Sequence, residues 1–166
     1  MAADHTEIIG GPCEALVDAA TVGHTAGGCS MTYTPQQREV VVDQFGSSPV
    51  NYRHTGHEVR ATVPFAEWTA TTIGLLYAGS VTLTDEMGVG RPAGSLLPDV
   101  DLKLVPFTAA DVGKYVHVPR AVPIGAMTIS YSNDQDTIFE QEYAGLIDPS
   151  LTAGQQMFTV GVDTGA

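Results

Sequence analysis

Two histidines and a glutamate lie within five residues of one another in His54-Thr55-Gly56-His57-Glu58. Imidazole and carboxylate groups at such spacing could hold a zinc ion. Metalloprotease motifs, however, place the two histidines on a helix with the glutamate in a set position, and this segment is predicted to be a hairpin turn. The sequence therefore favours a cross-strand histidine pair near solvent, and we expect no metal site.

Two loop segments have weaker motif patterns. Gly88-Val89-Gly90-Arg91-Pro92-Ala93-Gly94 has the glycines of a dinucleotide loop, but no clear strand precedes it and no helix pattern follows. Asn133-Asp134-Gln135-Asp136 lacks the central glycine and final glutamate of a calcium loop, which favours a polar hairpin turn. We therefore expect neither segment to bind a cofactor.

Catalytic patterns are also missing from the sequence. Carboxylate pairs such as Asp99 and Asp101 more often form a solvated face than a general acid and base. There is no Gly-x-Ser-x-Gly elbow and no Gly-Lys-Ser or Gly-Lys-Thr phosphate loop. We expect no catalytic residue, no cofactor and no enzymatic activity.

Cys13 and Cys29 are the only cysteines. Because no export signal is evident, we expect two reduced, partly buried side chains. A disulfide between them is one alternative. A metal site completed by His24 is another, although neither a Cys-x-x-Cys pair nor a fourth ligand is evident.

The charge balance excludes several classes of partner. The chain has 19 acidic residues against 7 Lys plus Arg, a formal net charge of -12 and a pI near 4.5. Binding of nucleic acids rests on lysines and arginines that replace counterions, so specific DNA or RNA binding is not expected, nor is docking on anionic membranes. The sequence also predicts no signal peptide and no membrane insertion, which indicates synthesis and folding in a cytoplasm.

Composition and length predict a single, mainly β domain spanning residues 1–166. Only 16% of residues are charged, against roughly 25% in a typical globular domain, so part of the surface is not expected to face water. Many threonines and valines, with 18 Gly and 10 Pro, favour strands separated by turns. Residues 1–25 are predicted to form an N-terminal arm and a first strand.

The periodicity predicts a β-sandwich or barrel with one flanking helix. The strongest alternation places Val59, Ala61, Val63 and Phe65 on one face of a strand. A helical stripe that includes Trp68 predicts a helix at about residues 65–77, and residues 79–100 form a long loop. Further strands are predicted at residues 14–25, 29–34, 38–43, 50–54, 101–107, 114–119, 126–132, 137–146 and 157–160.

The run REVVVDQFGSSPVNYR, residues 38–53, poses a packing problem. Val40, Val41 and Val42 are consecutive, so a strand here has apolar side chains on both faces. A second apolar face must be covered by something, and the chain offers no obvious partner for it.

Two longer segments resemble the bacteriophage tail tube protein family, also called major tail proteins. The first is GGCSMTYTPQQREVVVDQFGSSPVNYRHTGHEVRATVPFAEWT, residues 27–69. The second is YVHVPRAVPIGAMTISYSNDQDTIFEQEYAGLIDPS, followed by MFTVG. Together they cover residues 26–161, with the resemblance in order and spacing. Residues 1–25 and 79–100 match nothing in that pattern.

The resemblance implies a structural virion protein of the phage tail, related to the tubes of contractile injection and type VI secretion systems. Subunits of that family form rings, commonly hexameric, that stack into a hollow tube through which DNA is delivered to the host without specific binding. Implied partners are other copies of the chain, a tail-tip initiator, a tape-measure protein and a tail terminator. The loop at 79–100 is then expected to order on assembly.

This interpretation assigns two sets of residues. A neighbouring subunit would cover the apolar strand, which makes Arg38, Val40, Val41, Val42 and Tyr52 the interface candidates. An acidic bore would repel phosphate, and the candidates for it are Glu39, Asp43, Glu58 and Asp101.

Two alternatives remain open at the level of the sequence. A head-tail connector or capsid decoration protein would use a similar β-rich domain but form a single ring or isolated trimers. A ligand- or carbohydrate-binding β-sandwich would need an exposed aromatic cluster in a groove, whereas the lone Trp68 falls on the predicted core stripe of the helix.

Overall fold

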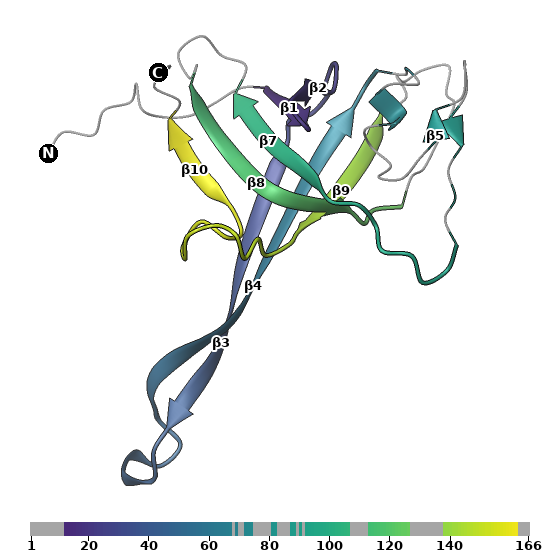
Figure 1. The fold of residues 1–166 in the computed structure, drawn as a ribbon. Coiled ribbons are helices and arrows are strands. Elements are labelled where there is room, and N and C mark those ends of the chain that lie inside the picture. Colours follow the sequence, from purple (N-terminus) through teal and green to yellow (C-terminus); the bar gives the residue numbers. More distant parts are fainter. Residues whose placement is uncertain are drawn as a thin grey trace, which may run out of the picture.

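A curled antiparallel sheet forms the body of the protein (Figure 1). The computed structural model describes residues 12–67, 69, 72–74, 81–82, 87–88, 90, 92–106, 113–126 and 138–162. The eight-stranded sheet has the order β2-β1-β7-β8-β9-β4-β3, and β10 pairs with β8 beside this path. Its strands are β1 (Cys13–Val17), β2 (Ala20–Thr21), β3 (Ser30–Val41), β4 (Pro49–Phe65), β7 (Val100–Pro106), β8 (Lys114–Pro123), β9 (Phe139–Gly145) and β10 (Thr159–Val162). The predicted mainly β fold is confirmed.

The two ends of the sheet are brought together, which gives the body a barrel-like curl. After β2 the chain runs beside the end of β4, where Thr25 forms a bridge with Phe65 and the Ala26 N–H donates to the Pro64 carbonyl at 3.2 Å. Cys13, at the start of β1, forms a disulfide with Cys29, directly before β3. The expectation of two reduced cysteines is therefore wrong, because the closure of the sheet brings these positions together.

The core lies inside the curl and follows the predicted alternation. Val59, Ala61, Val63 and Phe65 of β4 are all buried, while Arg60 between them is exposed. They pack in one cluster with side chains of β1, β7, β8 and β9, including Val17, Leu102, Val118 and Tyr143. Each fully buried large apolar side chain contributes roughly 1.5–3 kcal/mol, so this cluster holds the body together.

β3 and β4 continue beyond the body as a long ribbon (Figure 1). We call its distal part, residues 36–55, the projecting hairpin; its tip holds a short 3-10 turn, η2 (Asp43–Phe45). The predicted separation of strands 29–34 and 38–43 is wrong, because Pro35 between them stays within β3, opposite His57. The predicted hairpin turn at Thr55-Gly56 is also wrong, because β4 runs through it. A register shift there leaves Thr55 as the extra residue of a β-bulge.

The predicted helix and long loop fall largely outside the described residues. Helical geometry is described for residues 72–74, where the Ile73 N–H donates to the Thr69 carbonyl at 3.0 Å, and the Thr69 hydroxyl accepts from the Thr72 N–H. Within the range 79–100, β5 (Val81–Thr82) pairs with β6 (Met87–Gly88) as a short hairpin, and β7 begins at Val100. The predicted strand at 126–132 lies outside the described residues, apart from Ala126. No helix in the described ranges is long and apolar enough to cross a membrane.

Candidate assembly surface

The projecting hairpin carries large apolar side chains that nothing in the described chain covers. Phe45 at its tip is 65% exposed, Tyr52 56% and Val41 46%. Every residue from 43 to 55 is exposed. A two-stranded ribbon without a third strand or a packed face is at best marginally stable in water, so the projecting hairpin is a candidate contact surface.

The strand register places apolar side chains on both faces of the projecting hairpin. Because paired residues share a face, Val41 lies with Pro49, and Glu39 with Tyr52. Val40 and its partner Asn51 lie on the opposite face. The register thus places Val40 and Val41 on opposite faces, as the three consecutive valines predicted. Val42 follows β3 and directly precedes the turn at the tip.

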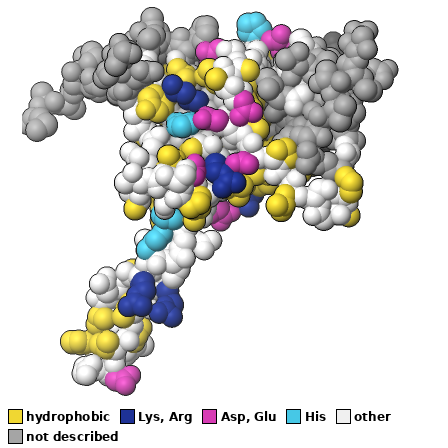
Figure 2. Space-filling view, in the orientation of Figure 1, with side chains coloured by type: hydrophobic (Ala, Val, Ile, Leu, Met, Phe, Trp, Pro, Cys, Tyr) yellow, Lys and Arg dark blue, Asp and Glu magenta, His cyan; other side chains and the backbone are white. Residues whose placement is uncertain are grey.

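Two arginines form the charged part of the projecting hairpin. Arg38 and Arg53 are directly opposite each other in the register, and Figure 2 shows basic side chains gathered on the ribbon between its histidines and its tip. Like charges directly opposite each other destabilise a ribbon. Within the described residues neither arginine has an acidic partner, so an acidic group of another molecule would relieve the repulsion.

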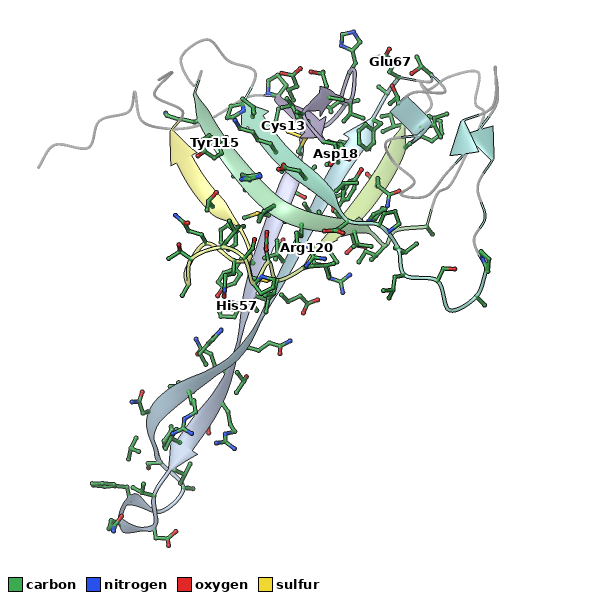
Figure 3. All side chains as sticks on the ribbon, in the orientation of Figure 1. Cys13, Asp18, His57, Glu67, Tyr115 and Arg120 are labelled. Carbon is green, nitrogen blue, oxygen red and sulfur yellow. A yellow bond between two sulfur atoms is a disulfide. The ribbon has the colours of Figure 1, made fainter. Side chains whose placement is uncertain are left out.

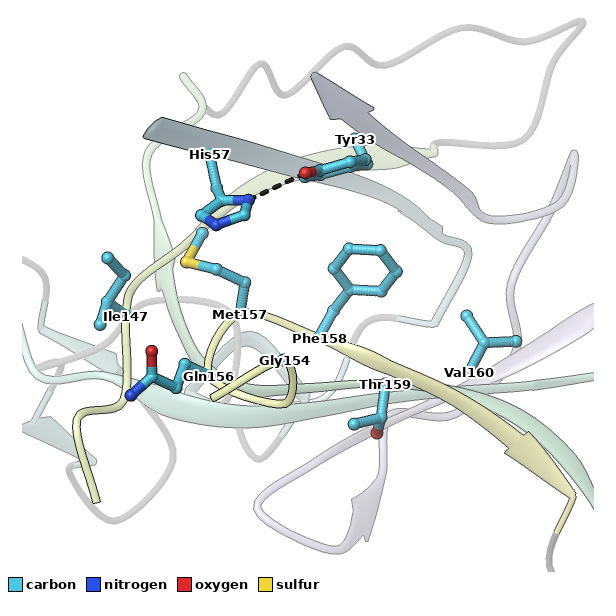
Figure 4. Close-up of a pocket in the computed structure, with 9 residues that line it drawn as sticks. All are labelled: Tyr33, His57, Ile147, Gly154, Gln156, Met157, Phe158, Thr159 and Val160. Carbon is cyan, nitrogen blue, oxygen red and sulfur yellow. Dashed lines mark hydrogen bonds between the residues drawn. The ribbon is translucent and has the colours of Figure 1, made fainter. Parts of the chain in front are cut away.

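A groove of about 540 Å³ lies where the projecting hairpin meets the body (Figure 4). Tyr33 of β3 and His57 of β4 line one side of the groove, and a 2.8 Å hydrogen bond joins Tyr33 Oη and His57 Nδ1. Ile147, Met157 and Phe158 line the body side, and the Tyr33 and Phe158 rings are 5.2 Å apart. The groove is therefore mostly apolar with a polar edge.

His54 and His57 are not a cross-strand pair, since both belong to β4. Their Nε2 atoms are 3.0 Å apart. Figure 3 places His57 at the junction of the ribbon and the body. No group of three or more histidine, cysteine, aspartate or glutamate side chains able to hold a metal gathers among the described residues.

The four acidic candidates for the bore do not form one cluster. Glu39 and Asp43 lie on the projecting hairpin. Glu58 accepts a 2.8 Å bond from Arg60, which also donates to Glu142 at 2.8 Å. These two carboxylates raise the pKa of the Arg60 guanidinium, Glu142 more than Glu58.

Asp101, the fourth candidate, has partners on the body. Its Oδ2 lies 2.9 Å from His117 Nε2, and its N–H donates to Asp18 Oδ1. The nearby Asp99 instead accepts from Arg120 Nε, and this hydrogen bond lowers the pKa of the Asp99 carboxyl and raises that of Arg120. The two aspartates therefore pair with separate basic side chains rather than with each other.

Sequence reasoning missed Phe45, Val50 and Arg53 as surface residues. All three lie on the projecting hairpin and are exposed. Phe45 and Val50 could have been found from the sequence, because they are apolar residues on either side of the Gly46-Ser47-Ser48 loop. Arg53 could be assigned only once the register placed it opposite Arg38. The long register itself could not be read from the sequence, because the bulge at Thr55 shifts the alternation.

Comparison with solved structures supports the fold assignment. A chain of the PVC sheath-tube complex of an extracellular contractile injection system in its extended state superposes with a TM-score of 0.54 and 12% identity, over 90% of this chain and 88% of that one. A chain of the anti-feeding prophage cap, the AFP tube terminating cap, gives a TM-score of 0.55 and 10% identity, over 98% and 95%. No family model matches the sequence, and no curated protein does. The chain thus has a tail-tube-like fold.

Proposed function

We propose that this chain is a structural, non-enzymatic subunit that assembles with its own copies into rings, which stack into the hollow tube of a phage tail. DNA would pass through the tube to the host without specific binding. The observation that carries the proposal is the projecting hairpin of this tail-tube-like fold, which leaves Val41, Phe45 and Tyr52 exposed. Rings of six are the expected stoichiometry.

Burial energetics favour a protein partner for the projecting hairpin. Fully burying a side chain such as Val41, Phe45 or Tyr52 stabilises an assembly by roughly 1.5–3 kcal/mol each. Exposed apolar strands left in water are sites of uncontrolled association. A neighbouring copy that covers these side chains removes this hazard and provides the driving force for ring formation.

The charges of the chain fit self-association through the same segment. Arg38 and Arg53 lie on a ribbon without acidic partners, while the whole chain carries a net charge of -12. Another copy therefore offers an acidic surface to this basic patch. The remaining excess of carboxylates makes any bore unfavourable for phosphate, which suits the passage of DNA.

A second candidate is a tube-terminating cap, a single ring at the end of a tube. It is favoured by the likeness to the AFP tube terminating cap, which extends over nearly the whole chain. The two candidates differ in whether a ring can accept another identical ring on both of its sides.

Negative-stain electron microscopy of the concentrated, purified chain tests the proposal. Stacked rings or hollow tubes are the expected result, whereas isolated rings would favour the cap. If only monomers form, addition of tail-tip proteins should start assembly. Monomers that persist under these conditions would contradict both candidates.

A single substitution locates the interface. Val41→Asp places a carboxylate in the proposed apolar contact and should abolish rings, while circular dichroism stays unchanged because Val41 is outside the core. Val41→Ile is the matched control, since it keeps an apolar side chain and should still assemble. Rings formed equally well by Val41→Asp would refute the role of this surface.

A further inference from the structure

The β-bulge in β4 places two histidines on the same face of the ribbon. In a regular strand, residues three positions apart point to opposite faces. Here Gln36 pairs with Gly56 and Gln37 pairs with His54, so Thr55 is the extra residue and the alternation shifts by one position. His54 and His57 consequently point the same way, which a regular strand at this spacing would not produce.

A hydrogen bond joins the two imidazoles at their Nε2 atoms, so one of these nitrogens carries a proton that a bound metal ion would replace. These atoms are 3.0 Å apart, while the ring centroids are 4.1 Å apart and the rings are inclined at 52°. Rings meeting end to end would have centroids much farther apart than their nitrogen atoms. The two rings are therefore tilted against each other and do not meet end to end, and both side chains are exposed.

This separation matches two adjacent positions around a metal ion. An ion about 2.0–2.1 Å from each nitrogen would make an angle of about 91–97° with the two nitrogens. Square-planar and tetragonal ions such as Cu²⁺ and Ni²⁺ require about 90° between neighbouring ligands. A tetrahedral zinc ion would need the nitrogens opened to about 3.4 Å. The separation of the two nitrogens is thus closer to that of neighbouring ligands on a tetragonal ion than to that on a tetrahedral one.

Tyr33 supplies the outer support that metal-binding histidines need. When Nε2 of His57 binds a metal, its Nδ1 carries the proton and can donate to Tyr33 Oη, 2.8 Å away. Such a bond fixes the ring orientation and the tautomer of a histidine ligand. Tyr33 in turn packs against Phe158 across the groove (Figure 4).

We infer that His54 and His57 form a surface site for a divalent tetragonal transition-metal ion, Cu²⁺ or Ni²⁺, at the base of the projecting hairpin. Both Nε2 atoms bind the ion, Tyr33 orients His57, and water occupies the other positions. The expectation that this segment holds no metal rested on a turn between the histidines, where the structure has a bulge. This inference is independent of the proposed tube.

Calorimetric titration of the untagged full chain with NiCl₂ and with CuCl₂ tests the site. One ion per chain should bind, and either His54→Ala or His57→Ala should weaken this binding by about tenfold or more, since each removes one of two ligands. His117→Ala is the matched control because His117 is a histidine of the body paired with Asp101, and it should bind like the wild type. Equal affinity in all four proteins would overturn the site.

Two further measurements separate ligation from a general effect on folding. The electron paramagnetic resonance spectrum of the Cu²⁺ complex should show two bound imidazole nitrogens in the wild type and one in each single variant. An identical spectrum in His54→Ala would overturn the site. Tyr33→Phe keeps the ring contact with Phe158 and should weaken binding by about tenfold, and unchanged affinity would overturn the positioning role of Tyr33.

Discussion

Arg120 connects two parts of the chain through its guanidinium group. It donates from Nε to Asp99, ahead of β7, and from a terminal nitrogen to the Ile147 carbonyl at 3.1 Å, after β9. Both ends of the contact are partly open to solvent, so the ion pair is screened. Its main consequence is a dependence of stability on pH, because the pKa of Asp99 is lowered in the folded state.

The ion pair between Arg120 and Asp99 should stabilise the fold at neutral pH and lose its effect in acid. A carboxyl group whose folded pKa lies below its ordinary value of about 3.9 stabilises the fold above that value. The contribution is lost as the pH falls through the folded pKa. We expect Asp99→Asn to lower the free energy of unfolding at pH 7, and the difference from wild type to shrink as the pH falls below about 4. Urea denaturation at both pH values measures this.

Asp43→Asn is the matched control for this experiment. Asp43 lies at the tip of the projecting hairpin, and no ion pair of its side chain is found among the described residues. This variant should track the wild type at every pH. A loss of stability in Asp99→Asn that is the same at pH 7 and at low pH would argue against the ion pair as its cause.

The strands differ in how well their position and register can be predicted from the sequence. The β4 segment from Val59 to Phe65 could be predicted because one face is buried along its whole length, so apolar and polar residues alternate. The projecting hairpin has no buried face, so its length and register leave no such pattern. The bulge at Thr55 and the disulfide depend on contacts between strands, which single-strand periodicity does not contain.

The candidate site could be predicted only in outline. The adjacent valines at 40–42 indicated an apolar surface in need of a partner; of the three, Val41 is exposed, while Val40 and Val42 are half-buried. The sequence could not show that Arg53 lies opposite Arg38, or that His54 and His57 share a face, because both follow from the register. The assignment of acidic residues to a bore stays a prediction, since a bore exists only between subunits.

The disulfide between Cys13 and Cys29 links the start of β1 covalently to the start of β3. Its removal should lower the stability of the body. It closes a loop with a sequence separation of 16. The loss of such a cross-link costs about 3 kcal/mol on a chain-entropy basis. For a chain of this size that corresponds to a melting temperature lower by roughly 6–12 °C. Thermal unfolding with and without reductant measures the effect.

A variant with both cysteines replaced, Cys13→Ser with Cys29→Ser, provides the control. It should melt at the temperature of the reduced wild type and should not respond to reductant. If the wild type melts at one temperature in both conditions, the disulfide contributes nothing to the stability of the fold.

For the whole molecule, the dominant property is its negative charge. A wall that carries carboxylates repels DNA, and removal of those charges should allow it to bind. Glu39 and Asp43 are the two bore candidates for which the described residues provide no basic partner. If they face the bore, tubes of Glu39→Lys with Asp43→Lys should retain short DNA at 50 mM salt and release it at about 200 mM.

Wild-type tubes should retain no DNA under either condition. Glu140→Lys, at an exposed position of β9 on the body, is the control for a charge change away from the projecting hairpin. Electron microscopy must first show that the variants still form tubes. Retention no greater than in wild-type tubes would remove Glu39 and Asp43 from the bore.

During synthesis, β1 leaves the ribosome long before β7, the strand with which it pairs. Asp18, just after β1, receives a hydrogen bond from the Asp101 N–H across a sequence separation of 83. At about 5–20 residues per second, a ribosome needs roughly 4–17 s to cover that distance. A hairpin such as β3–β4 forms within about 1–10 μs once its second strand is available. The first strand pairs with β2 at once but waits these seconds for β7, and a chaperone that shields nascent chains can act in that interval.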